Sequence, residues 1–174
     1  MLPRREVLTW MDVDQLIDHL IPQFEPEFDS MIMITNGGIL PGGMLAEALG
    51  LHTILTASVD FPNEVQMEEE RKKRRLLAWP KFIQFPDDSL LVGQKILTVD
   101  DVWGSGRTIT AVRNRIASAG GKAYTCVLHF NPYRNLFGKV RPDYYAAVTD
   151  AHIIYPWEIN RGQDRILMDY GNSE

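Results

Sequence analysis

The sequence predicts an α/β fold in which a mostly parallel central sheet is flanked by helices and carries a small cap. Two observations carry this prediction. Apolar strand-like runs alternate with segments of helical periodicity, and two of these runs pass through a glycine-rich turn directly into a helix. Strands that alternate with helices form right-handed crossover units, which place the strands parallel. Both glycine turns are therefore expected at the carboxyl ends of strands, where such sheets bind ligands.

The composition indicates one ordinary domain over residues 1–174. The chain is 45% apolar and contains neither an internal repeat nor a Gly/Ser-rich linker. Its net charge of −5 disfavours nucleic acids and acidic membranes as partners, although a local basic pocket could still bind a phosphorylated small molecule. Cys126 is the only cysteine, and no run approaches the ~20 apolar residues that span a bilayer, so we expect a cytoplasmic protein.

The first element in order is a helix after Trp10. Its apolar residues recur at helical spacing. Asp12 with Gln15 is typical of a capping box, and Pro22 or Pro26 is expected to end the helix.

Two strand–turn–helix units follow. The first has a strand at 31–35, the NGG turn, and a helix closed by Gly50, whose apolar face is Met44, Leu45, Ala48 and Leu49. The second has a strand at 95–99, a turn at 104–108, and a helix ended by Gly120 and Gly121, with Ile109, Val112, Ile116 and Ala119 inward. Further strands are expected at 53–59 and 123–130.

The second turn has the composition of a phosphate-binding loop preceded by two carboxylates. Gly104 and Gly106 let main-chain N–H groups converge at a helix N-terminus, and nearby hydroxyl and guanidinium groups add donors. Asp100 and Asp101 would repel a phosphate directly. They fit a site in which they accept hydrogen bonds from sugar hydroxyls or hold a divalent cation. The turn therefore suggests a sugar phosphate bound with a metal ion.

These residues resemble a known family. The segment VDDVWGSGRT resembles the phosphoribosyl-diphosphate-binding signature of type I phosphoribosyltransferases. TNGGILPGGMLAEALG is similar to the diphosphate loop of that family and its following helix, and RPDYYAAVTDAHIIYPWE is similar to the base-binding end of the 6-oxopurine branch, especially the xanthine-guanine type. A double acid between a strand and a helix is a fairly specific signal, whereas a glycine turn alone is a weak one.

The resemblance implies a role for each matching residue. Asp100 and Asp101 would contact the ribose hydroxyls and Mg²⁺, and Trp157 would stack on the purine. The 5′-phosphate would be bound by Gly104, Ser105, Gly106, Arg107 and Thr108, and the diphosphate would be faced by Asn36, Gly37 and Gly38. The implied enzyme transfers a phosphoribosyl group to a purine-like base in nucleotide salvage and forms a dimer or tetramer.

Three positions differ from the family pattern. Gly104 stands where the purine branch has an acidic residue suited to proton transfer at the base. Asn131 stands where a lysine reads the 6-oxo group, and Asn36 stands where the diphosphate loop carries a basic residue. These differences leave open an alternative, in which a protein of the same fold binds phosphoribosyl diphosphate or a nucleotide for regulation without turnover.

Other residues have competing interpretations. Trp157 could instead be a core or interface aromatic, and the NGG turn could be a tight connection that needs positive φ. The charge run from Glu68 to Arg75 is typical of an exposed helix with i,i+4 ion pairs, although its arginines could also approach the diphosphate or another subunit. The four histidines show no metal-ligand spacing and are expected to be structural or exposed.

Overall fold

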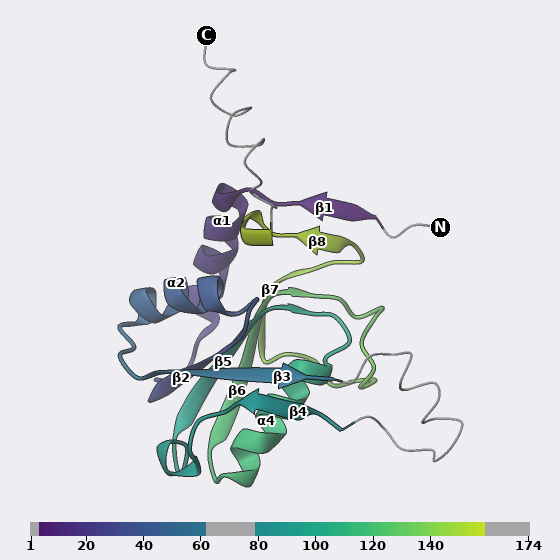
Figure 1. Cartoon of the computed structure of the whole chain (residues 1–174). Coiled ribbons are helices and arrows are strands. Elements are labelled where there is room, and N and C mark those ends of the chain that lie inside the picture. The colour runs from purple at the N-terminus through teal and green to yellow at the C-terminus, as the bar shows by residue number, and fades with distance from the viewer. Residues whose placement is uncertain (1–3, 62–78, 159–174) are drawn as a thin grey trace, which may run out of the picture.

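The computed structural model describes residues 4–61 and 79–158, and the charge run from Glu68 to Arg75 lies outside them. A six-stranded sheet has the order β4-β3-β2-β5-β6-β7, and a separate two-stranded sheet pairs β1 with β8 (Figure 1). The strands are β1 (Arg5–Val7), β2 (Ser30–Ile34), β3 (Ile54–Asp60), β4 (Lys81–Gln84), β5 (Lys95–Trp103), β6 (Lys122–Phe130), β7 (Tyr144–Val148) and β8 (His152–Ile154). The α-helices are α1 (Trp10–Leu20), α2 (Ile39–Leu49) and α4 (Arg107–Ser118).

The prediction of a mostly parallel sheet is confirmed. All neighbouring strands of the main sheet pair in parallel except β3 and β4, which are antiparallel. The β1–β8 pair lies at one end of the molecule and forms the predicted cap together with the turn Pro156–Glu158 (Figure 1). Three short 3-10 turns complete the described elements: η1 (Ile21–Gln23), η2 (Asp88–Leu90) and η3 (Pro156–Glu158).

The core forms two layers because successive side chains of a strand point to opposite faces. On β2, Met31 and Met33 pack with the layer that holds α1 and α2, whereas Ile32 and Ile34 pack with the layer that holds α4. All five residues of β2 are buried, as expected for a central parallel strand covered on both faces. Figure 1 shows α1 and α2 on the opposite side of the sheet from α4.

Helix α1 is capped one turn earlier than the sequence predicted. Thr9 is the N-cap, its hydroxyl accepts from the N–H of Asp12, and the Asp12 carboxylate accepts from the N–H of Thr9. The prediction of a box between Asp12 and Gln15 is therefore wrong, because threonine one turn upstream already occupies the cap. Pro22 lies in the 3-10 turn that follows α1, so the prediction that a proline ends this helix is confirmed.

The helix of the first strand–turn–helix unit buries a face that differs from the predicted one. Helix α2 begins at Ile39, and Leu45 and Ala46 are buried, whereas Ala48, which was predicted to face inward, is exposed. Gly50 adopts φ 63° at the end of the helix, as its position predicted.

The second unit differs more, because strand β5 does not stop at Val99. It continues through both aspartates to Trp103 and remains paired with β6 up to Phe130. Helix α4 then starts at Arg107, and the four residues predicted to face inward, Ile109, Val112, Ile116 and Ala119, are all buried. The double acid thus lies at the carboxyl end of a central strand and not in a free turn.

Candidate functional site

The two predicted ligand-binding turns lie side by side at the carboxyl ends of the adjacent strands β2 and β5. A methyl group added to Gly37 would lie 2.5 Å from both carboxylate oxygens of Asp101, so the NGG loop runs directly against the double acid. Gly38 is equally close to the main chain, because an added methyl group would lie 2.8 Å from the carbonyl oxygen of Ile34 and closer still to that of Val99. Parallel pairing of β2 with β5 places these loops together.

The glycines of the NGG loop serve close approach and not an unusual backbone angle. Gly38 has φ −78°, and Gly37 is not among the glycines with positive φ. The interpretation that this turn needs positive φ is therefore wrong. Asn36 is exposed, and its carbonyl oxygen accepts the N–H of Ile39, which starts helix α2. The loop thus keeps a main-chain conformation that lies against Asp101.

The carboxylates of Asp100 and Asp101 are half-buried and close to one another. The N–H of Asp101 donates to the Asp100 carboxylate over 3.0 Å, and the N–H of Val102 donates to the Asp101 carboxylate over 2.7 Å. Burial, and then the neighbouring Asp101 charge, raise the pKa of Asp100 well above its usual value. Burial also raises the pKa of Asp101 to about 6, against the N–H of Val102, which lowers it.

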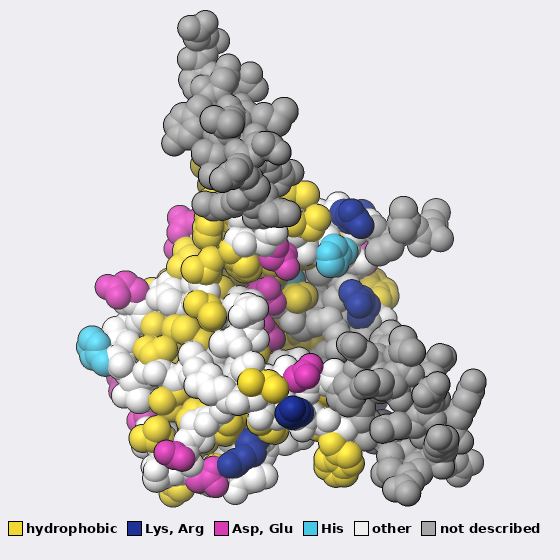
Figure 2. All heavy atoms as spheres, viewed as in Figure 1, with side chains coloured by type: hydrophobic (Ala, Val, Ile, Leu, Met, Phe, Trp, Pro, Cys, Tyr) yellow, Lys and Arg dark blue, Asp and Glu magenta, His cyan; other side chains and the backbone are white. Residues whose placement is uncertain are grey.

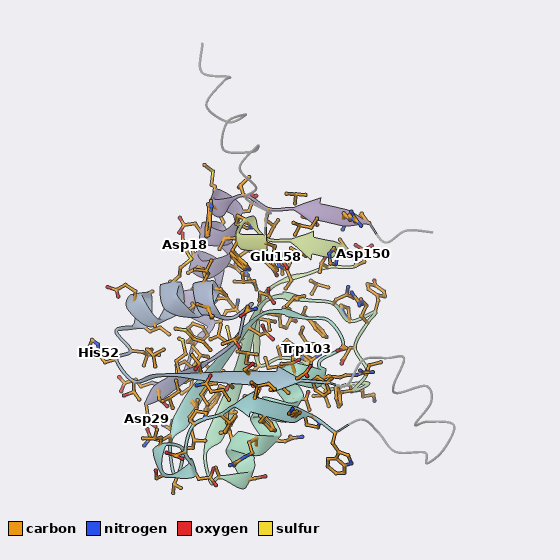
Figure 3. All side chains as sticks on the ribbon, viewed as in Figure 1. Asp18, Asp29, His52, Trp103, Asp150 and Glu158 are labelled. Atoms are coloured by element: carbon orange, nitrogen blue, oxygen red, sulfur yellow. The ribbon has the colours of Figure 1, made fainter. Side chains whose placement is uncertain are left out.

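The raised pKa values mean that the charged forms of both carboxylates are disfavoured. Two acids that are drawn from water and face one another favour protonation, unless a cation or a set of hydroxyl donors stabilises their charged forms. Glu158 of the cap raises the pKa of Asp101 further. Figure 2 shows acidic side chains gathered between the cap and the main sheet, and Figure 3 labels Glu158 on the cap and Trp103 at the end of β5.

The turn between β5 and α4 presents main-chain donors at a helix N-terminus. Gly106 adopts φ 78° directly before the helix, and an added methyl group there would meet the indole ring of Trp103. Gly104 does not have a positive φ and faces open space. Ser105, Arg107 and Thr108 are half-buried around this turn, which can bind an anion through N–H groups and the helix dipole.

A loop after β6, residues 131–140, is anchored onto this turn, and the sequence did not indicate it. The indole N–H of Trp103 donates to the side-chain oxygen of Asn135 over 3.2 Å, and the N–H of Leu136 donates to the carbonyl oxygen of Ser105 over 3.1 Å. Asn135 also donates to the carbonyl oxygen of Val140 over 2.6 Å. An asparagine in a polar loop gives no local sequence signal for such a contact.

Asn131, predicted to contact the base, is 2% exposed and starts this loop. Its side-chain oxygen accepts the N–H groups of Tyr133 and Arg134 over 3.1 and 3.3 Å. The oxygen therefore stabilises the turn, and the amide NH₂ group is the part of Asn131 left to meet a base.

Trp157, the predicted base platform, is half-buried in the cap. Its ring stacks on Tyr155 at 4.6 Å between centroids with an interplanar angle of 3°, and Trp10 lies 6.0 Å away at 50°. This packing beside Tyr155 supports the interpretation of Trp157 as a core aromatic, whereas its role as a base platform stays a prediction.

The histidines fall as expected. His19, His52 and His152 are exposed, and His129 is buried. Among residues 4–61 and 79–158, no three His, Cys, Asp or Glu side chains are grouped to hold a metal ion by themselves. No helix in that part of the chain is both long and apolar enough to cross a membrane.

Comparison with known proteins agrees with this geometry. The chain is 30% identical over 109 residues to an adenine phosphoribosyltransferase of Pelodictyon phaeoclathratiforme, covering 63% of this chain and 59% of the relative. It is 26% identical over 157 residues to a xanthine-guanine phosphoribosyltransferase of Gluconobacter oxydans, covering 87% and 83%. No protein-family model matches the sequence.

Solved structures extend the likeness over nearly the whole chain. A purine phosphoribosyltransferase from Pyrococcus horikoshii is 25% identical with a TM-score of 0.73, over 91% of this chain and 97% of that one. The chain is therefore similar in sequence and in fold to purine phosphoribosyltransferases. A Neisseria gonorrhoeae protein solved with bound ppGpp shares the fold, with a TM-score of 0.73 and 23% identity over 98% of this chain and 99% of that one. The matches to the adenine phosphoribosyltransferases of P. phaeoclathratiforme and Geobacter metallireducens span only 59% and 64% of those relatives' lengths.

Proposed function

We propose that this protein belongs to the type I phosphoribosyltransferase family and is a purine phosphoribosyltransferase, which moves the phosphoribosyl group of phosphoribosyl diphosphate onto a purine-like base and releases diphosphate. The approach of the NGG loop to the Asp101 carboxylate carries this proposal. It brings a main-chain loop against a double acid that lies shortly before the N-terminus of α4 in the chain, an order of groups that suits a ligand with a diphosphate, a ribose and a 5′-phosphate. The relatives named as purine phosphoribosyltransferases support the transferase over the regulatory alternative.

In this site the protein's own residues bind and orient the two substrates. Asp100 and Asp101 accept hydrogen bonds from the ribose hydroxyls, and the turn 104–108 binds the 5′-phosphate through its N–H groups. The NGG loop faces the departing diphosphate, and Trp157 offers its ring to the base. As the bond from C1 of the ribose to the diphosphate oxygen breaks, the electron pair leaves with the diphosphate. The base nitrogen then bonds to C1 and loses its proton, through a sugar with oxocarbenium character.

Mg²⁺ fits the proposed site because Asp100 and Asp101 are two close carboxylates whose charged forms need a cation. Mg²⁺ typically takes one or two carboxylates and completes its shell with water and substrate phosphate oxygens. Asp100 and Asp101 would hold it, and it would neutralise charge on the diphosphate. A cytoplasmic location and a homo-oligomer, a dimer or tetramer, complete the proposal.

The experiment is a thermal shift with phosphoribosyl diphosphate and Mg²⁺, followed by assays of diphosphate release with adenine, hypoxanthine, guanine and xanthine. Ligand at a hundredfold excess over its Kd adds about 2.7 kcal/mol to the free energy of unfolding. Asp100→Asn with Asp101→Asn should remove most of that shift. A double variant that responds like the parent would show that the aspartates do not bind ribose or metal. Binding without diphosphate release would favour the regulatory alternative.

The stability of this double variant without ligand shows whether it is folded. Folding raises both carboxyl pKa values, so between about pH 4 and pH 6 the native state binds more protons than the unfolded state, and the contribution of Asp101 to stability falls as pH rises. At pH 8 the Asn variants without ligand should therefore be at least as stable as the parent. His129 acts in the opposite sense, because burial lowers its pKa to about 4. The difference between variant and parent, and not the parent's own pH profile, isolates the aspartates.

A further inference from the structure

His129 and Tyr155 form a buried polar pair directly behind the double acid. Tyr155 is 1% exposed and His129 is 5% exposed. The His129 Nδ1 atom lies 2.8 Å from the Tyr155 hydroxyl, which in turn donates to the main-chain carbonyl oxygen of Asp101 over 3.0 Å. A chain of two hydrogen bonds thus runs from the carboxyl end of β6 through the cap to the peptide that follows Asp101.

The direction of both hydrogen bonds follows from the groups involved. A carbonyl oxygen can only accept, so the single hydroxyl proton of Tyr155 points to Asp101. Nδ1 of His129 must then carry the hydrogen and donate to the tyrosine oxygen. The histidine therefore fixes the direction of the hydroxyl. Because His129 donates to the Tyr155 oxygen, the hydroxyl proton of Tyr155 is left to donate to Asp101.

Tyr155 also contacts the predicted base platform. Its ring stacks face to face on Trp157, and its N–H donates to the Glu158 carboxylate over 2.8 Å. One side chain thus bonds to the main chain of a ribose-binding residue and supports the ring on which the base would stack. These two substrate contacts come from β5 and the cap, which are far apart in the sequence.

We propose that Tyr155 is a positioning residue that sets Trp157 relative to Asp101, and that His129 acts through the Tyr155 hydroxyl. The proposal rests on the proposed transferase function, since it assigns the two ends of this link to the two substrates. Transfer requires that the base nitrogen and C1 of the ribose be aligned, whereas the binding of either substrate alone does not require this alignment. Loss of the link should therefore lower kcat and leave each KM nearly unchanged.

Tyr155→Phe tests the link because phenylalanine keeps the stacked ring and removes only the hydroxyl. We expect kcat to fall about tenfold, with both KM values within about threefold of the parent, as a net loss near one buried hydrogen bond predicts. Tyr145→Phe is the matched control, because Tyr145 is a half-buried tyrosine of β7 that packs on Phe130. Equal kcat values for the two variants would overturn the proposal.

The histidine is tested by a pair of variants. The side-chain amide of Asn can place a donor near the Nδ1 position, so His129→Asn should keep kcat within about threefold of the parent, whereas His129→Leu should lower it as Tyr155→Phe does. The double variant Tyr155→Phe with His129→Leu should be no slower than Tyr155→Phe alone, because the histidine acts through the hydroxyl. An additive loss would overturn the role given to His129. Should His129→Leu fail to fold, Tyr155→Phe still tests the link, and a His129→Asn variant as slow as Tyr155→Phe would overturn the donor role given to His129.

A spectroscopic readout separates this proposal from the proposed function. The N–H of Val102 belongs to the same peptide unit as the Asp101 carbonyl, so its ¹⁵N signal should shift more in Tyr155→Phe than in Tyr145→Phe, whether or not the protein turns over. No such shift would overturn the link itself. If Tyr155→Phe shows the shift but the parent releases no diphosphate with any purine, the transferase function is overturned, and with it the catalytic role of the link.

Discussion

The two strand-to-helix turns of the site look alike in sequence but need their glycines for different reasons. In the NGG loop, Gly37 and Gly38 lie against Asp101 and the main chain of β2 and β5, with no positive φ at either. In the turn after β5, Gly106 combines φ 78° with contact to Trp103, while Gly104 is free of both constraints. One turn is built by close packing, and the other by a backbone angle at a single residue.

This difference shows which positions of each turn can accept a side chain. A turn that fits against main-chain atoms of two central strands cannot accept a side chain, because those atoms cannot move without breaking the sheet. A turn fixed at one residue leaves its other positions open to selection for chemistry. Gly104, the position at which the family's purine branch has an acid, is such an open position.

The largest expected effect is that of Gly38→Ala. Its methyl group would overlap the carbonyl oxygens of Val99 and Ile34, and we expect it to lower the free energy of unfolding by about 3 kcal/mol or more. Gly43→Ala is the control, because Gly43 lies in the helix that Gly38 caps, has nothing within 4 Å of an added methyl group, and should gain up to about 1 kcal/mol. Urea unfolding measures both. Equal stabilities would show that the NGG loop is not held by close packing.

The next largest effect is expected from Gly106→Ala, which should lower the free energy of unfolding for two reasons: the backbone angle and a steric contact. A residue with a side chain pays about 1–2 kcal/mol at such a φ, and the methyl group would also meet the Trp103 ring. Gly50→Ala has φ 63° in open space and should pay the first cost alone. The difference between the two losses in thermal unfolding measures the Trp103 contact. A Gly106 variant less affected than the Gly50 variant would contradict it.

A smaller loss of stability, but a larger loss of binding, is expected from Gly37→Ala. Its methyl group meets a carboxylate that can rotate, so we expect about 1 kcal/mol in stability. Rotation takes the Asp101 carboxylate from its place beside the loop, and affinity for phosphoribosyl diphosphate with Mg²⁺ should fall about tenfold or more, which is 1.4 kcal/mol. Calorimetry with and without Mg²⁺ measures it. Unchanged affinity would separate Asp101 from the ligand.

The sequence predicted the parallel sheet and the inward face of α4 because both depend on local apolar periodicity. It also predicted that the double acid and both turns lie at the carboxyl ends of strands, and the structure places them at the ends of the adjacent strands β2 and β5. It did not indicate that β5 continues to Trp103, since strand pairing with β6 and not local composition decides where that strand ends. Two residues of the site network, His129 and Asn135, had no sequence signal, because their partners Tyr155 and Trp103 are distant along the chain.

The smallest effect on stability is expected from Gly104→Asp. This position has open space and no positive φ, so the change should stay within about 0.5 kcal/mol of the parent. Adding Asn131→Lys to this variant would destabilise the loop 131–140, because lysine would remove the oxygen that accepts the N–H groups of Tyr133 and Arg134.

The gain expected from Gly104→Asp is in turnover. A carboxylate at the edge of the 5′-phosphate turn could take the proton that the base nitrogen loses, and general base assistance contributes about 10²–10⁴-fold where its geometry is good. We expect the parent to turn over hypoxanthine, guanine and xanthine well below the typical kcat of about 10 s⁻¹, and Gly104→Asp to raise that rate. Gly104→Asn, of similar size but unable to take the proton, is the control in the diphosphate-release assay. Fast purine turnover by the parent, or an equal gain with asparagine, would show that other residues supply the base and that Gly104 is open for a reason unrelated to proton transfer.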